Sequence, residues 1–334
     1  MRPNIRENNF MLNSPPKLSI ITPSLNHGRF LRDTIDSIIS QSYKNFEHII
    51  IDGGSTDNTM EILREYPHIR WVSEKDDPKG GIADVYRKAF SMSQGEYIIQ
   101  CCVSDGFLNK NWFSKCIEIL DTDHEVSLVW GFPQYMSEEG NLTKISYSEF
   151  FDDPPPQKTD FFAYWLVTAF ILPEGNYCVR REVFDICFPK GNLESPFKSI
   201  PHSGFNYNFN TLGYLPYFIP LIANYGRTHK DSRGQLLYEK ETILRKKYRQ
   251  YVKNYRSKFL NGEIVHYFRN GSSEVINKVS SKEFNYYRKK IWRYQITESR
   301  FMRLPLYTLY KKLFQRLKRQ KKADKGRHCS APGS

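Results

Sequence analysis

Residues 18–57 decide the fold of this chain. Residues 18–22 read LSIIT, a short β-branched run that Pro23 ends, and residues 46–51 read FEHIII, a second run that is stopped by the turn DGG at 52–54. Short apolar runs bounded by turn residues predict buried strands. Residues 29–41, between the two runs, carry Phe and Ile side chains at helical spacing. The order strand, helix, strand predicts a parallel pair joined by a crossover helix.

The same rhythm continues along the chain. We expect a helix at 59–66, a strand at 70–73, a helix at 82–92 and a strand at 97–102. Alternating strands and helices imply an α/β fold with a mostly parallel, Rossmann-like sheet.

From about residue 126 the pattern changes to mixed strands, a Pro-rich turn at 152–156 and aromatic stretches, and beyond 236 it becomes basic and helical. The helices expected there span 236–259, 284–296 and 304–321. The longest apolar run, 161–172, has twelve residues, whereas a membrane span needs about 20, so it predicts a buried helix or an interfacial patch.

The net charge of +13 is unevenly distributed. Residues 1–240 have a net charge of −6 and residues 241–334 a net charge of +19, so the basic character belongs to the C-terminal extension. Such a strip predicts contact with anionic lipid headgroups or nucleic acid. An acidic body and the lack of a recognition motif argue against nucleic acid.

Cysteine usage and the N-terminus bear on location. The six cysteines form no Cys-x-x-Cys pair and join no His at zinc-ligand spacing, and residues 1–16 carry no apolar signal core. We therefore expect a reduced, cytoplasmic environment. The basic extension adds the expectation of a peripheral position on the inner face of the cell membrane, where cationic amphipathic helices bind headgroups.

Polar loops follow all four of the first predicted strands, at 22–28, 52–57, 73–77 and 104–106. Ligands of an open α/β sheet bind at the carboxyl ends of its strands, so the four loops together favour a site over turn chemistry alone. A carboxylate at Asp52 can accept hydrogen bonds from a base such as uracil, while Gly53 and Gly54 let the backbone approach closely. Asp105 can hold a divalent cation, Mn²⁺ or Mg²⁺, that neutralises a diphosphate leaving group.

These segments, in this order, resemble the inverting family-two glycosyltransferases with the GT-A fold. The resemblance covers residues 17–120 strongly and continues weakly to about 235. The segments that carry it are 19–26, 37–43, 51–59, 73–77, 80–84 and 95–98.

The resemblance implies a nucleoside-diphosphate sugar as donor, a UDP-sugar first among them. By position, Asp52 would bind the base and Asp84 would lie near the donor sugar or ribose. Ser104 and Asp105 occupy the family's Asp-x-Asp-like site, in which Ser104 replaces the first acidic residue and could hydrogen-bond the ribose. This departure leaves metal dependence in question. Four loop residues complete the predicted donor site, with Thr22, Pro23 and Ser24 lining the base pocket and Asn26 beside them.

Two further segments bear on catalysis. Arg227-Thr228-His229 resembles the family's Arg-x-His, which would make His229 a metal or diphosphate ligand. Inverting transfer needs a general base, and the family's acid falls in 202–210, where this chain has no carboxylate and places Asn206. His202 is the predicted base there, since histidine titrates near neutral pH. A displaced carboxylate such as Glu194, or an inactive protein, is the alternative.

The resemblance and the composition predict four regions: an N-terminal tail (1–16), a nucleotide-sugar-binding half (17–125), an acceptor-binding half (126–235) and the basic extension (236–334) with a disordered end. The expected activity is transfer of a monosaccharide to a hydroxyl, with a glycan or lipid-linked acceptor. A catalytically inactive nucleotide- or partner-binding GT-A protein is the alternative. Nucleotidyl transfer is disfavoured, because the loop after the first strand lacks the usual glycines and basic residue.

Overall fold

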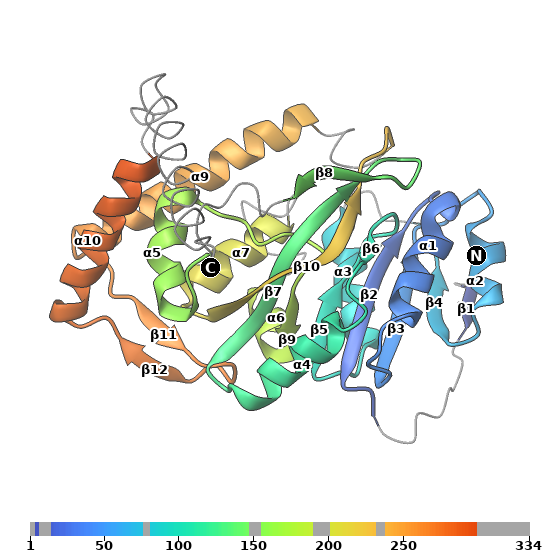
Figure 1. Ribbon diagram of the computed structural model, residues 1–334, viewed down its shortest axis with the longest axis horizontal. Helices are drawn as coiled ribbons and strands as arrows, with labels where there is room; N and C mark the ends of the chain where they lie inside the picture. The colour runs from blue at the N-terminus through green and yellow to red at the C-terminus, as the bar shows by residue number, and fades with distance from the viewer. Residues whose placement is uncertain are drawn as a thin grey trace, which may run out of the picture. The chain divides into compact units, whose positions relative to one another are not determined.

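The structure is a computed structural model, shown in Figure 1. It describes residues 4–6, 15–75, 81–146, 155–189, 201–231 and 238–298. The chain divides into two compact units between Ser280 and Ser281. The helix α10 (Ser281–Glu298) belongs to the second unit, and every other element described below belongs to the first.

Four parallel strands form the sheet that residues 18–102 predict. They are β2 (Leu18–Ser24), β3 (Phe46–Asp52), β4 (Ile69–Ser73) and β5 (Tyr97–Gln100), in the spatial order β4-β3-β2-β5. The expectation of a parallel sheet is confirmed here. The strands are buried almost throughout, which accounts for their near-continuous apolar sequences.

Three helices connect these strands close to the predicted bounds: α1 (Gly28–Ile39), α2 (Thr59–Glu65) and α3 (Gly81–Met92). In α1 the buried side chains include Phe30, Leu31, Ile35 and Ile38, which form one apolar stripe. The helices α1 and α2 pack together over Ile50 of β3 and Ile69 of β4 in one core cluster, and α3 packs on β2 and β3.

The order in which the chain adds strands to the sheet reverses at β2, which makes the gap between β2 and β5 the topological switch point of the sheet. The chain passes from β2 through β3 to β4 on one side, and β5 then pairs with β2 on the other side. The crevice between the carboxyl ends of two such strands is where ligands bind in open α/β sheets. The loops after β2 and β5 border this crevice.

The second half of the sheet is mixed, as the change of pattern after residue 126 predicts. Its long strands β7 (Val126–Met136) and β10 (Leu215–Arg227) run parallel to each other (Figure 1). At its carboxyl end β10 also pairs with β6 (Gly106–Phe107), so it returns to the loop that follows β5. The remaining elements of the first unit are β1 (Asn4–Arg6), α4 (Trp112–Thr122), β8 (Leu142–Ser146), α5 (Lys158–Thr168), β9 (Cys178–Arg180), α6 (Arg181–Cys187), α7 (Pro201–Thr211), α9 (Tyr238–Leu260), β11 (Tyr267–Arg269) and β12 (Val275–Lys278).

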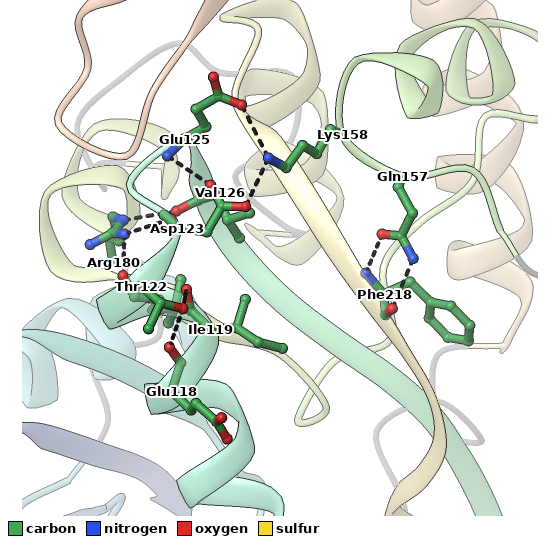
Figure 2. A network of polar contacts seen from close by, with 11 residues as sticks. Glu118, Ile119, Thr122, Asp123, Glu125, Val126, Gln157, Lys158, Arg180 and Phe218 are labelled. Carbon is green, nitrogen blue, oxygen red and sulfur yellow. Dashed lines mark hydrogen bonds and ion pairs between the residues drawn. The ribbon is translucent and has the colours of Figure 1, made fainter.

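A polar network joins the end of α4 to the start of β7 (Figure 2). The ammonium group of Lys158 lies 2.8 Å from Asp123 Oδ2 and 3.1 Å from Glu125 Oε2. From β9, the Arg180 guanidinium donates to the carbonyl oxygens of Leu120, Asp123 and Val126. These contacts hold the turn between α4 and β7 against β9.

The side chain of Gln157 pairs with the backbone of β10 (Figure 2). Its Nε2 donates to the Phe218 carbonyl oxygen at 2.8 Å, and its Oε1 accepts from the Phe218 N–H at 2.7 Å. The Gln157 amide thereby satisfies the backbone N–H and C=O of the buried Phe218, as a neighbouring strand would otherwise do.

The apolar run at 161–172 lies largely in α5, where Phe161, Phe162 and Trp165 are buried. The expectation of a buried helix is confirmed. Trp165 Nε1 donates a 2.9 Å hydrogen bond to the hydroxyl of Tyr248 on α9. The basic extension therefore begins with a helix that packs into the first unit, whereas the predicted helix at 304–321 lies outside the described residues. No helix in the described part of the chain is long and apolar enough to cross a bilayer.

Candidate functional site

The carboxyl ends of three parallel strands lie in register. Ser24 of β2 is the register partner of Asp52 of β3, which is in turn the partner of Ser73 of β4. The loops that follow also touch, since the Gly53 N–H donates to the Ser24 carbonyl and the Glu74 N–H to the Asp52 carbonyl. The structure thus brings three of the four predicted loops together at one edge; residues 76–80 lie outside the described part.

Asp52 organises this edge. Its Oδ2 accepts hydrogen bonds from the N–H groups of Gly54 and Ser55, at 3.1 and 2.9 Å, and from the Ser73 hydroxyl at 2.7 Å. Its Oδ1 accepts from the Ser55 hydroxyl. The side chain is fully buried, so in this structure Asp52 shapes the loop rather than facing outward. Its predicted contact with a base stays a prediction.

Asn26 and Asp57 join the loops after β2 and β3. Asn26, at a φ of 53° in the left-handed region, accepts the Thr56 N–H at Oδ1 over 2.8 Å. Asp57 accepts the Gly28 N–H at the start of α1 and the Thr59 N–H at the start of α2. Burial acts to raise the pKa of Asp57, but these hydrogen bonds outweigh it and leave that pKa below its usual value. The carboxylate therefore serves both helix N-termini.

The residues predicted to line the base pocket differ in their availability. Thr22 is fully buried, and its hydroxyl shares a 2.9 Å hydrogen bond with His48 Nε2. Burial lowers the pKa of His48 to about 3, which keeps its ring neutral. Ser24 Oγ has no hydrogen-bond partner among the described residues, and Pro23 is half-buried. Because Ser24 Oγ is itself buried, Pro23 is the one of the three that keeps part of its surface exposed.

Ser104 and Asp105 follow β5 on the other side of the crevice. Ser104 adopts a φ of 93°, an uncommon conformation for a residue with a Cβ. The Thr34 hydroxyl of α1 accepts from the Ser104 N–H at 3.2 Å and donates to the Asp105 carbonyl at 2.7 Å. Thr34 is therefore a site-shaping residue that no local sequence signal identified.

The carboxylate of Asp105 faces the end of β10. Its Oδ1 accepts the Arg227 N–H at 3.1 Å. Burial raises the pKa of Asp105 to about 7, an effect that the Arg227 N–H opposes and the charge of Glu174 reinforces. Among the described residues the Arg227 charge also lowers this pKa, but no side-chain cation hydrogen-bonds the carboxylate, so a bound cation would further stabilise its ionised form.

His229, two residues beyond β10, packs in an aromatic cluster. Its ring centroid lies 4.8 Å from that of Phe30 and 5.1 Å from that of His27. It is 3% exposed, burial lowers its pKa, and its Nδ1 has no partner among the described residues. A neutral imidazole with a free nitrogen can ligate a metal. Arg227, by contrast, stacks its guanidinium on Phe30 at 4.7 Å and donates to Asp33.

Asp84 and His202 have different surroundings. Asp84 is exposed in the first turn of α3. His202 Nε2 lies 2.6 Å from the Leu172 carbonyl oxygen, to which it must donate, and its Nδ1 lies 3.4 Å from the Tyr177 hydroxyl. The Tyr177 hydroxyl donates its own proton to Gln100 Oε1 at 2.7 Å, so Nε2 of the predicted base is held by the backbone, while Nδ1 faces the buried Tyr177 side chain. Glu194, the alternative base, lies outside the described residues.

The described residues contain no group of three or more His, Cys, Asp or Glu side chains arranged to hold a metal ion. By donor type, Asp105 would offer a divalent cation an oxygen ligand and His229 a neutral nitrogen ligand. A cation bound there would need further oxygens from the substrate.

Comparisons with known proteins agree with this architecture. The chain is 30% identical over 137 residues to chondroitin synthase of Escherichia coli, covering 40% of this chain and 19% of that protein. It is 33% identical over 138 residues to the putative teichuronic acid biosynthesis glycosyltransferase TuaG of Bacillus subtilis, covering 39% and 52%. The crystal structure of S. aureus TarS shares its fold with a TM-score of 0.50 at 16% identity, covering 86% of this chain and 45% of that one.

The parallel sheet, the reversal of strand order at β2 and these likenesses define the GT-A fold that glycosyltransferases share. A sequence model described as glycosyl transferase family 2 matches residues 19–187, about half of the chain, and the chain belongs to that family.

Proposed function

We propose that this protein transfers a monosaccharide from a nucleoside-diphosphate sugar, a UDP-sugar first among them, to an acceptor hydroxyl with inversion. The observation that carries the proposal is the register of Ser24, Asp52 and Ser73 at one sheet edge, with Asp105 across the switch point. The names of the relatives, synthases and transferases of polysaccharides, support synthesis of a surface polysaccharide or lipid-linked glycan as the setting.

The donor nucleotide would lie against the loops after β2 and β3. Pro23 and Ser24 would meet the base, and Asp84 would bind the donor sugar or the ribose. Asp52 would act chiefly through the loop that it holds, since a direct contact with a base requires Ser55 to release Oδ1. Asn26 would keep the two loops joined.

Asp105 and His229 would hold Mn²⁺ or Mg²⁺, and diphosphate oxygens would complete the coordination. The cation supplies positive charge where the leaving diphosphate becomes more negative. Ser104, in place of an acidic residue, would hydrogen-bond the ribose. With one carboxylate instead of two, the site would bind the cation weakly until the donor is present.

The expected location is the cytoplasmic face of a membrane. The net charge of +19 over residues 241–334 supports electrostatic binding to anionic headgroups. This charge would place the active site near lipid-linked acceptors.

A specific observation favours the alternative of an inactive nucleotide-binding protein. Asn206 stands where the family has an acid, and its Oδ1 accepts the Leu172 N–H at 2.9 Å in a fully buried position. An amide so placed cannot take a proton from an acceptor.

Thermal shift with UDP, GDP, dTDP and CMP, each with and without Mn²⁺, tests the donor site, because a ligand at about 100 times its Kd stabilises the native state by about 2.7 kcal/mol. We expect a shift that is selective for UDP and larger with Mn²⁺. Release of UDP from UDP-sugars then separates the two proposals: binding with turnover supports the transferase, and binding without turnover supports the inactive protein. No shift with any nucleotide would contradict both.

A further inference from the structure

The proposed transfer requires a group that removes the proton of the acceptor hydroxyl, and α7 offers none in its present arrangement. Among the residues of α7, His202 donates from Nε2 to the Leu172 carbonyl and stacks its ring on the buried Tyr177 ring, and Asn206 is a buried amide. The helix contains no carboxylate between Pro201 and Thr211. The base must therefore come from another element.

Glu174 lies in the turn that leads into β9, directly beside Asp105. Gly175, the next residue, has a φ of 75°, and a Cβ built on it would lie 3.9 Å from Asp105 Oδ2 and 3.6 Å from the Gln100 carbonyl oxygen at the end of β5. The backbone after Glu174 thus lies close enough to the Asp105 carboxylate that a Cβ at 175 would be in van der Waals contact with it, and its positive φ favours glycine at 175. Glu174 itself is exposed, so an acceptor can reach it.

One oxygen of Glu174 is held in place. Its Oε1 accepts a 3.1 Å hydrogen bond from the hydroxyl of Tyr86, which is 1% exposed on α3. Its Oε2 makes none of the hydrogen bonds found among the described residues. A rigid phenol therefore orients the carboxylate while the second oxygen stays available.

Electrostatics agree with this placement. The charge of Glu174 raises the pKa of Asp105 and the pKa of the Cys102 thiol. In the described part of the chain it is the one carboxylate that acts on Asp105 in this way. A cation held by Asp105 would offset the negative charge that these two carboxylates bring together.

We propose that Glu174 is the general base of the transfer reaction, an assignment that rests on the proposed function. Its Oε2 takes the proton of the acceptor hydroxyl while the acceptor oxygen bonds to the anomeric carbon of the sugar. The bond from that carbon to the diphosphate oxygen breaks, and its electron pair stays on the diphosphate. The products are the glycosylated acceptor, the nucleoside diphosphate and a protonated Glu174, which returns its proton to water.

The test compares Glu174→Gln with the wild type in two assays on the full chain. The first measures UDP release from UDP-glucose, UDP-N-acetylglucosamine and UDP-glucuronic acid with Mn²⁺, in which water serves as acceptor. The second measures UDP affinity by calorimetry. We expect UDP release to fall by about 10² to 10⁴-fold, the usual contribution of a general base, with UDP affinity within about threefold. The matched control is Glu182→Gln, an exposed carboxylate in the first turn of α6, which should retain full activity.

The pH profile gives a readout that a structural role would not alter. With Mn²⁺ raised to saturation at each pH, so that protonation of Asp105 does not limit metal binding, the wild-type rate should fall at acid pH as the base takes up a proton, and in Glu174→Gln this fall should disappear from the residual rate. If the wild type turns over the donor and Glu174→Gln does so at the same rate, Glu174 is not the base. The proposed transferase function would be unaffected by that result. A wild type that binds UDP without releasing it from any of the three sugars, or binds no nucleotide, would overturn the proposed function and the base together.

Discussion

The backbone N–H of Arg227 donates a hydrogen bond of 3.1 Å to Asp105 Oδ1, although the two residues stand 122 positions apart in the chain. The contact exists because β10 runs parallel to β7 and then pairs with β6, which follows Asp105 directly. It brings the carboxylate after β5 and His229 to the same end of β10.

Metal binding should depend on pH through Asp105. Because burial raises the pKa of this carboxyl to about 7, it holds a proton below that pH, and a cation must displace the proton to bind. The affinity for Mn²⁺ in the presence of UDP should therefore fall about tenfold per pH unit below 7 and level off above it. Titration calorimetry between pH 6 and 8 measures this, and the lowered pKa of His229 keeps that ring neutral over most of the range. Asp105→Asn should bind weakly at every pH; a wild-type affinity that is constant across the range would contradict the role of Asp105.

Asp52 and Asp84 should differ in what they contribute. Asp52→Ala leaves the N–H groups of Gly54 and Ser55 without their acceptor, so we expect a loss of about 3 kcal/mol in the free energy of unfolding together with weaker nucleotide binding. Asp84 is exposed, and Asp84→Ala should weaken binding of the UDP-sugar without a change in stability. Urea denaturation and calorimetry on both variants measure the two effects. Equal stability of the variants would show that the Asp52 network is not needed to hold the loop.

Gln157→Met should destabilise the protein without affecting the site. The substitution keeps the length of the side chain but removes both partners of the Phe218 backbone, and each buried polar group left unpaired costs about 1–3 kcal/mol. We expect a loss of about 2–4 kcal/mol in urea denaturation, with UDP affinity unchanged in the fraction that is folded. A loss of affinity in folded protein would mean that β10 transmits the change to Arg227.

Removal of residues 300–334 should separate membrane contact from nucleotide binding. The segment is strongly basic, and each Lys or Arg near an anionic surface contributes about 1 kcal/mol to binding. Co-sedimentation with phosphatidylserine vesicles should fall sharply in the truncated chain at low salt, whereas the thermal shift with UDP should persist. Equal sedimentation of both chains would refute a membrane role for this segment.

Much of the first half of the fold follows from local sequence. The strands β2, β3, β4 and β5 and the helices between them lie within about two residues of their predicted bounds, because buried parallel strands and amphipathic helices carry their periodicity in a short window. The polar turns that end the strands predict a site at the carboxyl edge, since all parallel strands finish on one side.

The roles of single residues in that site depend on contacts that no short window contains. Thr22 and Asp52 look alike in the sequence as polar residues at strand ends, yet Thr22 bonds to His48 and Asp52 to its own loop. His202 is the predicted base, and only the structure shows that its Nε2 donates to the Leu172 carbonyl, a contact 30 positions away in the chain.

By itself the sequence determined the α/β rhythm, the family resemblance and the basic character of residues 241–334, and it predicted the sheet edge at which the site lies. Only the tertiary structure decided which side chains turn inward, that Asp105 meets Arg227 and that Glu174 lies beside Asp105. The physical reason is the distance along the chain over which each effect acts. Strand and helix preferences depend on a few neighbouring residues. The orientation and pKa of a side chain in the site depend on groups that β10 and the turn before β9 bring from far along the chain.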